Sequence, residues 1–245
     1  MASGWAQTNE THFGFPEFFC APLRIHLLQA TNAPAVQTTL TSTDVERILT
    51  KINRVWAQAG ISFYLESLRT EEAFAPESYD EQWKNGASRR LLLPLRPLTS
   101  EATNLFHLYY LKHMTVNGIH FPEGNFVKDT ASLRPVTGGI DEPLPRVSSH
   151  ELGHALTLPH RQNTTNLMAS GTTGTSFDAA EISQVRQAAE KLPWIRSAPK
   201  LLETANTLFA TGQQAEAELL YRGLALLPGM VAGVGGRVQP RVTAK

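Results

Sequence analysis

Apolar and polar residues alternate near the start of the chain in a way that predicts strand, helix and strand in succession. Residues 23–30 carry apolar side chains at alternate positions, which is typical of a strand. Thr43 and Glu46 then form a capping-box pattern, and the apolar residues that follow recur at helical spacing until Gly60, which suits a helix end. Alternating apolar residues at 61–65 predict a second strand directly afterwards. This order is typical of an α/β fold.

The middle of the chain is predicted to contribute short strands. Residues 105–113 are rich in β-forming side chains and predict a third strand. Asn117 and Gly118 form a hairpin signal that leads into a short strand over Ile119–Phe121. A further short strand is expected over 126–129. The sheet therefore gains its last strands from a hairpin in this region.

Two helices are expected in the following segment. One should begin near Val147–Ser149, after a loop that is rich in glycine and proline. The other begins at Asp178, where a carboxylate three residues later, that of Glu181, suits a capped first turn. Apolar residues at helical spacing continue that second helix up to Leu192.

The pattern changes after Pro199, and two helices are predicted over 201–210 and 213–227. The second of them, from Gln214 to Pro228, resembles the second helix of a tetratricopeptide repeat. Such repeats need neighbours to bury their faces, and this chain has a single copy. We interpret the segment as a helical hairpin that packs on the main domain or binds a protein partner.

These patterns divide the chain into four parts. We expect an irregular lead over 1–22, a principal domain over 23–195, the helical hairpin over 196–229, and a Gly-rich, basic tail over 230–245 that is disordered. Cys20 is the only cysteine, which excludes an intrachain disulfide framework. We interpret it as a buried structural residue, because no propeptide-like motif that could cap a metal surrounds it.

Charge and composition narrow the classes of partner. Lys+Arg and Asp+Glu are both 22, so no basic excess indicates binding to nucleic acid or to an anionic membrane. No apolar run approaches the roughly 18 residues of a membrane span. Residues 1–10 lack the basic start and apolar core of a signal peptide. The expected location is cytoplasmic, or extracellular if a leader has been removed.

The chemistry is concentrated in residues 150–154, which match the pattern H-E-x-x-H. On a helix, His150 and His154 lie one turn apart on the same face, so both imidazoles can reach one metal ion. Glu151 lies beside them, where it can act on a water molecule without being a ligand. His160 is the candidate third ligand, and it leaves one position open, as a catalytic zinc requires.

Residues 150–160, with Met168 downstream, resemble the metzincin signature H-E-x-x-H-x-x-G-x-x-H followed by a Met-turn. The short interval between His160 and Met168 is similar to that of small, matrixin-like bacterial members. The resemblance implies a zinc metalloendopeptidase with one catalytic ion. It also implies a twisted mixed sheet with a long helix and an active-site helix, then the Met-turn and C-terminal helices. Met168 would form an apolar floor beneath the zinc.

One position departs from that signature, because the glycine of the family falls on Thr157. Glycine is favoured there because the turn usually needs positive φ, which costs a β-branched residue roughly 1–2 kcal/mol. Either Thr157 tolerates this conformation, or the turn moves to Leu158 and Pro159. The departure affects the expected position of His160 and leaves His150 and His154 unaffected.

The resemblance also implies how a substrate binds. An extended peptide or unfolded protein would pair with an edge strand, here around Ile119, His120 and Phe121. Two alternatives stay open. One is a gluzincin-type peptidase in which Glu181 is the third ligand, although a first-turn carboxylate is also typical of a helix start. The other is a catalytically silent, metal-stabilised scaffold protein, against which the intact Glu151 argues.

Overall fold

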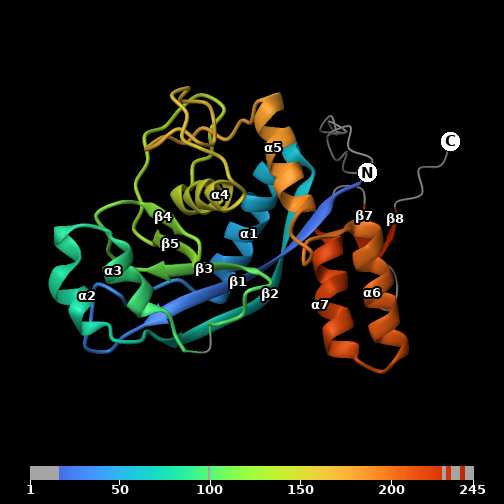
Figure 1. Ribbon diagram of the computed structural model, residues 1–245, viewed down its shortest axis with the longest axis horizontal. Coiled ribbons are helices and arrows are strands. Elements are labelled where there is room, and N and C mark those ends of the chain that lie inside the picture. The colour runs from blue at the N-terminus through green and yellow to red at the C-terminus, as the bar shows by residue number, and fades with distance from the viewer. Residues whose placement is uncertain (1–16, 99, 228–229, 233–237, 241–245) are drawn as a thin grey trace, which may run out of the picture.

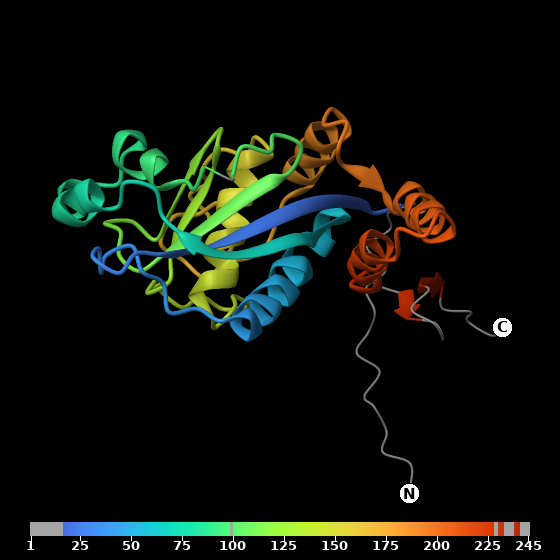
Figure 2. The same cartoon turned by 90° about the horizontal axis from the view of Figure 1, so that it is seen from below.

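The computed structural model describes residues 17–98, 100–227, 230–232 and 238–240. Its centre is a twisted, mostly parallel sheet in the order β2-β1-β3-β5-β4 (Figures 1 and 2). β4 runs antiparallel to β5 and forms one edge. The strands are β1 (Phe19–Gln29), β2 (Ile61–Glu72), β3 (Phe106–Leu111), β4 (Gly118–Phe121) and β5 (Gly124–Lys128). The mixed α/β architecture agrees with the predicted fold class.

Helix α1 (Ser42–Trp56) is the long helix that the apolar spacing predicts, and its start differs by two residues. Thr41 is the N-cap, and its side chain and that of Asp44 form the capping box reciprocally with the backbone. Thr43 and Glu46 therefore do not cap it, because an aspartate completes the same pattern nearer the start. Gly60, with φ 64°, ends the short η1 (Ala57–Ala59) that follows.

Helix α4 (Pro143–Ala155) packs beside α1 on the same face of the sheet (Figure 2). It begins earlier than the predicted Val147–Ser149, because the prolines of its first turn fit the positions where no N–H is needed. Apolar side chains of both helices and of this sheet face form the largest core cluster, which includes Trp56, Phe63 and Met168.

The segment between β2 and β3 covers the opposite face of the sheet. It contains α2 (Glu77–Gln82), η2 (Trp83–Asn85), α3 (Arg89–Leu92) and η3 (Leu93–Leu95). Tyr79 and Leu92 from these short helices are buried against Tyr109 and Phe126 of the sheet. The sequence predicts no element here, since each helix is too short to show a periodic pattern.

The expected hairpin at Asn117-Gly118 is wrong. β3 and β4 are not neighbours, since β5 lies between them, and the tight turn is the one that joins β4 to β5. The amide of Asn117 is used differently, because its Nδ2 donates to the Ser132 carbonyl at 2.8 Å. Gly118 is required for close packing, as a Cβ there would lie 2.5 Å from Glu151 Oε1.

Helix α5 (Ala179–Glu190) is capped by Asp178 and Glu181, as predicted. After it, β6 (Arg196–Ser197) pairs with the start of β1, which begins at Phe19 within the expected irregular lead. Most of the remaining lead lies outside the described residues. β1 extends this far because both β2 and β6 offer it backbone partners.

The C-terminal helices α6 (Ala198–Ala210) and α7 (Gln214–Ala225) form an antiparallel pair at one end of the sheet (Figure 1). They pack on the main domain, where Cys20 and Tyr64 join their apolar cluster. β7 (Met230–Ala232) and β8 (Val238–Pro240) pair in the segment that was expected to be disordered, and the rest of that tail lies outside the described residues. Among the described helices, none has the length and apolar character to cross a membrane.

Candidate metal centre

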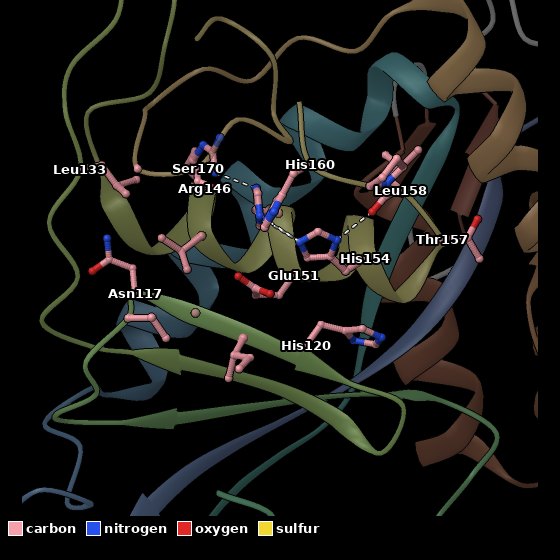
Figure 3. Close-up of a pocket in the computed structure, with 17 residues that line it drawn as sticks. Asn117, His120, Leu133, Arg146, Glu151, His154, Thr157, Leu158, His160 and Ser170 are labelled. Carbon is pink, nitrogen blue, oxygen red and sulfur yellow. Dashed lines mark hydrogen bonds between the residues drawn. The ribbon is translucent and has the colours of Figure 1, made fainter. Parts of the chain in front are cut away.

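Three imidazoles converge at the C-terminal half of α4. The Nε2 atom of His154 lies 3.1 Å from that of His150 and 3.1 Å from that of His160. One potential ligand atom from each histidine lies within 4.8 Å of the other two. His150 is buried, His154 is half-buried and His160 is exposed, so the group opens to solvent on one side (Figure 3). The predicted spacing therefore brings these three residues to one point.

The turn after α4 leads to His160, and its conformation depends on Thr157. Its φ is 74°, and Ala75 is the only other described non-glycine residue with positive φ. The Thr157 N–H donates to the His154 carbonyl at 2.9 Å, and the Leu158 N–H donates to the Gly153 carbonyl at 2.9 Å. Both bonds end the helix in a left-handed residue. Thr157 thus takes the conformation itself, and the turn does not move to Leu158 and Pro159.

Hydrogen bonds to the backbone orient two of the imidazoles. His150 Nδ1 lies 2.8 Å from the Leu167 carbonyl, and His154 Nδ1 lies 2.7 Å from the Leu158 carbonyl. A carbonyl only accepts, so each Nδ1 carries the hydrogen and each Nε2 keeps its lone pair. Burial lowers the pKa of His150 to about 3 and also lowers the pKa of His154. Both rings are therefore neutral, the form that binds a metal.

Met168 lies directly beneath this part of the helix. It is completely buried, and a Cβ on Gly153 would lie only 2.6 Å from its Sδ. Its turn is held by the Met168 N–H, which donates to Asn166 Oδ1 at 2.7 Å, and by its carbonyl, which accepts from the Arg161 N–H at 3.0 Å. Gly153 thus lets the helix and the methionine approach each other closely.

Arg146 is a residue of the site that sequence reasoning missed. It is 2% exposed, and its guanidinium donates from Nε to the Gly174 carbonyl at 3.0 Å and from Nη2 to the Ala169 carbonyl at 2.5 Å. These bonds tie the loop around Met168 to α4. Burial lowers the pKa of Arg146 to about 10, while the nearby Glu151 opposes that shift. Its position one turn before His150 was the only available signal.

Arg146 Nη1 also lies 3.1 Å from His150 Nδ1. This contact is not a hydrogen bond when the His150 N–H donates to the Leu167 carbonyl, because two donors then face each other. The guanidinium consequently places a positive charge behind the imidazole of His150.

Glu151 lies beside the three histidines and faces the cleft (Figure 3). It is 4% exposed, and burial raises its pKa to about 8, although the charge of Arg146 acts in the opposite direction. β4 covers it from below, where Gly118 leaves room for its carboxylate. A carboxyl group of this kind can take up and release a proton near neutral pH.

The cleft in front of these residues has a volume of about 700 Å³. Gly118, Ile119 and His120 of the edge strand β4 line it on one side, and Phe121 lines a neighbouring cavity. His120 is held by its Nδ1, which lies 2.9 Å from Asn125 Oδ1. The edge strand β4 therefore borders the cleft.

Two other candidates lie in different surroundings. Glu181 is completely buried, and its carboxylate accepts from Arg161 Nε at 2.8 Å and from Asn166 Nδ2 at 2.7 Å. It therefore braces the loop between His160 and Met168, and it is not part of the potential ligand group. Cys20 packs against the C-terminal helices, and burial raises its pKa to about 12.

No protein-family model and no curated protein matches this sequence. Several solved structures resemble it in part. Mature mirolysin from Tannerella forsythia, in complex with a cleaved peptide, is 11% identical with a TM-score of 0.46, over 69% of this chain and 91% of that one. Archaemetzincin from Methanopyrus kandleri is 16% identical with a TM-score of 0.48, over 70% and 96%. A zinc-dependent peptidase from Methanocorpusculum labreanum is 12% identical with a TM-score of 0.37, over 67% and 100%. At these values the function has to be argued from the site itself.

Proposed function

We propose that the protein is a zinc-dependent endopeptidase of the metzincin type, with one zinc held by His150, His154 and His160. The observation that carries this proposal is the convergence of three Nε2 atoms beside a buried carboxylate in an open cleft. The donor set fits zinc, since the rings of His150 and His154 are neutral and are fixed by backbone carbonyls. Three protein ligands leave a fourth position open toward the cleft.

Zinc, when bound, would supply a Lewis acid that polarises the scissile carbonyl and lowers the pKa of a water molecule and of Glu151. The other steps belong to residues of this chain. Glu151 accepts a proton from the attacking water and passes it to the leaving amine nitrogen. Met168 supports the helix at Gly153, and Arg146 holds the loop that carries Met168.

The substrate of this reaction is a peptide or an unfolded protein. Among the described strands, β4 pairs only with β5, so its other edge is free to pair with an extended chain along the cleft. Ile119 and Phe121 alternate with His120 on this strand, which places neighbouring side chains on opposite faces. Main-chain pairing would hold the peptide bond across the metal centre.

The test measures cleavage of casein or of a peptide library by the purified, zinc-loaded protein with and without a chelator. About one zinc per chain is expected from elemental analysis. Glu151→Gln should keep the zinc and lose the general-base contribution of about 10²–10⁴-fold in kcat. Glu203→Gln, an exposed change on α6, is the matched control and should cleave normally. Undiminished turnover by zinc-loaded Glu151→Gln would refute the assignment.

The scaffold alternative predicts zinc binding without any cleavage, so the same assay separates the two functions. A structural zinc site needs no general base, and burying the Glu151 carboxyl away from water is unfavourable for folding. The buried Glu151 therefore supports the peptidase over the scaffold. A protein partner at the α6–α7 hairpin remains a separate prediction.

A further inference from the structure

A second cavity adjoins the cleft beyond the end of β4. It has a volume of about 520 Å³ and lies between the β4–β5 turn, residues 100–107 and residues 192–194. The cleft and this cavity share three residues in their walls, which are His120, His154 and Thr157. Figure 3 shows His120 below His154, on the side of Thr157. A peptide that runs along β4 past His120 therefore enters the second cavity.

Part of the lining of this cavity is apolar. This part contains Phe106, Ala155, Leu192 and Trp194. The Trp194 ring meets the Phe106 ring edge-on, with 4.8 Å between centroids, and it remains half-buried. Part of the Trp194 side chain is thus exposed in a cavity whose wall also includes His154, a candidate metal ligand.

The charged residues that line the cavity are separate from these four apolar residues. Arg96 and Glu101 also border a smaller cavity next to Phe74 and Leu93, on the side of the short helices that cover the opposite sheet face. Glu123 in the β4–β5 turn is paired with Arg89. Of the three charged residues in the lining, two therefore also border the smaller cavity and the third is ion-paired.

The boundary between cleft and cavity is fixed in position. His120 is hydrogen-bonded through Nδ1 to Asn125 Oδ1, and Asn125 Nδ2 donates to the His107 carbonyl at 2.9 Å. Asn125 is 1% exposed, so this bridge is shielded from water. His120 therefore forms a defined wall between the two spaces.

We propose that this second cavity, here called the aromatic pocket, binds one large apolar side chain of the substrate, preferably an aromatic one, and sets cleavage specificity. The inference rests on the proposed peptidase function. Alternate residues of an extended chain point to opposite faces, so only one residue within a few positions of the scissile bond reaches the pocket. Aromatic rings suit it because they can pack edge-on or offset against Trp194 and Phe106.

The experiment compares kcat/KM for peptides that differ at one position, scanned through the three positions on each side of the cleaved bond. At a single position, phenylalanine, tyrosine or leucine should be favoured over glycine by about 10- to 100-fold. Trp194→Ala should reduce that ratio to within a few-fold of unity by removing the ring's partner. Ala102→Trp should also reduce it, by filling the pocket from the loop side without changing α4.

Trp83→Ala is the matched control. Its indole is also half-buried, and it stacks on His113 on the opposite side of the sheet. This variant should keep the wild-type preference. Circular dichroism and zinc content identify any variant that fails to fold. If Trp194→Ala fails to fold, the result for Ala102→Trp alone decides the test.

Two failures can be told apart. If peptides are cleaved but no position prefers a large apolar residue, or if both pocket variants keep the preference, the aromatic pocket is refuted. If the zinc-loaded protein cleaves no peptide, the proposed function fails. Fluorescence anisotropy of the same peptides then tests the pocket alone, and equal binding of phenylalanine and glycine peptides would overturn it.

Discussion

Thr157 offers the sharpest test of how the third histidine is positioned. Its φ of 74° lies in the left-handed region, where a β-carbon approaches the following carbonyl and costs about 1–2 kcal/mol. The chain accepts this cost because the Thr157 and Leu158 N–H groups then close the end of α4 and direct residues 158–160 back over the helix.

Thr157→Gly should therefore stabilise the protein. The substitution removes the steric cost of about 1–2 kcal/mol. It also raises the conformational entropy of the unfolded chain, which opposes folding by roughly 0.5–1 kcal/mol. It also removes the Thr157 Oγ1 contact with Gln184 Nε2 at 3.3 Å, while the stronger bond from Gln184 to the Thr157 carbonyl at 2.7 Å remains. The expected net gain is up to about 1 kcal/mol, or roughly 2–4 °C in Tm for a chain of this size.

The assay is thermal and urea unfolding of the metal-free protein, followed by the same measurement with zinc. Thr157→Ala separates the two effects, since alanine keeps the left-handed cost and lacks the hydroxyl, so it should lie below Thr157→Gly. The matched control is Thr50→Gly on the exposed face of α1, where glycine should destabilise the helix by roughly 0.3–0.5 kcal/mol, because threonine is already a weak helix former. If Thr157→Gly is destabilised as much as Thr50→Gly, residue 157 is helical and the reasoning is wrong.

Three further predictions follow from close contacts and buried charge. Met168→Leu should cost under about 1.5 kcal/mol and keep activity, whereas Met168→Ala should cost about 2–5 kcal/mol and weaken zinc affinity in a chelator competition. Gly118→Ala should lower the free energy of unfolding by about 1–3 kcal/mol and should also reduce the rate of cleavage, because the new Cβ would lie 2.5 Å from Glu151 Oε1. Unfolding and kinetics like those of the wild type would contradict this prediction. In the metal-free protein, the pKa of Glu151 rises from 4.5 in the unfolded state to about 8 in the folded state. Its stabilising contribution is therefore fully present below pH 4.5, declines progressively as the pH rises above 4.5, and is lost once the pH has passed about 8. Glu151→Gln should then match wild type at pH 4.5 and exceed it in unfolding free energy by about 3 kcal/mol at pH 7, and parallel pH profiles would refute this.

Regular periodicity made much of the fold predictable. The apolar stripe of α1 and the capped start of α5 depend on interactions between residues three or four apart, which a single sequence displays. The short helices between β2 and β3 could not be predicted from the sequence, since four to six residues cannot establish a helical period. Their positions depend on contacts with Tyr109 and Phe126 across the sheet.

The hairpin signal shows how tertiary packing changes the meaning of a local pattern. Asn117-Gly118 has turn chemistry, but the insertion of β5 between β3 and β4 makes it the start of an edge strand. Its glycine is needed because α4 and β4 approach closely at Glu151. A sequence displays that residue type without displaying the neighbour that requires it.

By itself, the sequence determined which residues could meet at a metal, because His150 and His154 are related by one helical turn. It also posed the question at Thr157, where a threonine replaces the expected glycine. Only the tertiary structure decided the answer, that Thr157 adopts positive φ, and only it placed the buried Arg146 behind His150. The aromatic wall around Trp194 likewise joins segments far apart in the chain. Local spacing fixes contacts within a helix, whereas contacts between distant segments depend on how the whole core packs.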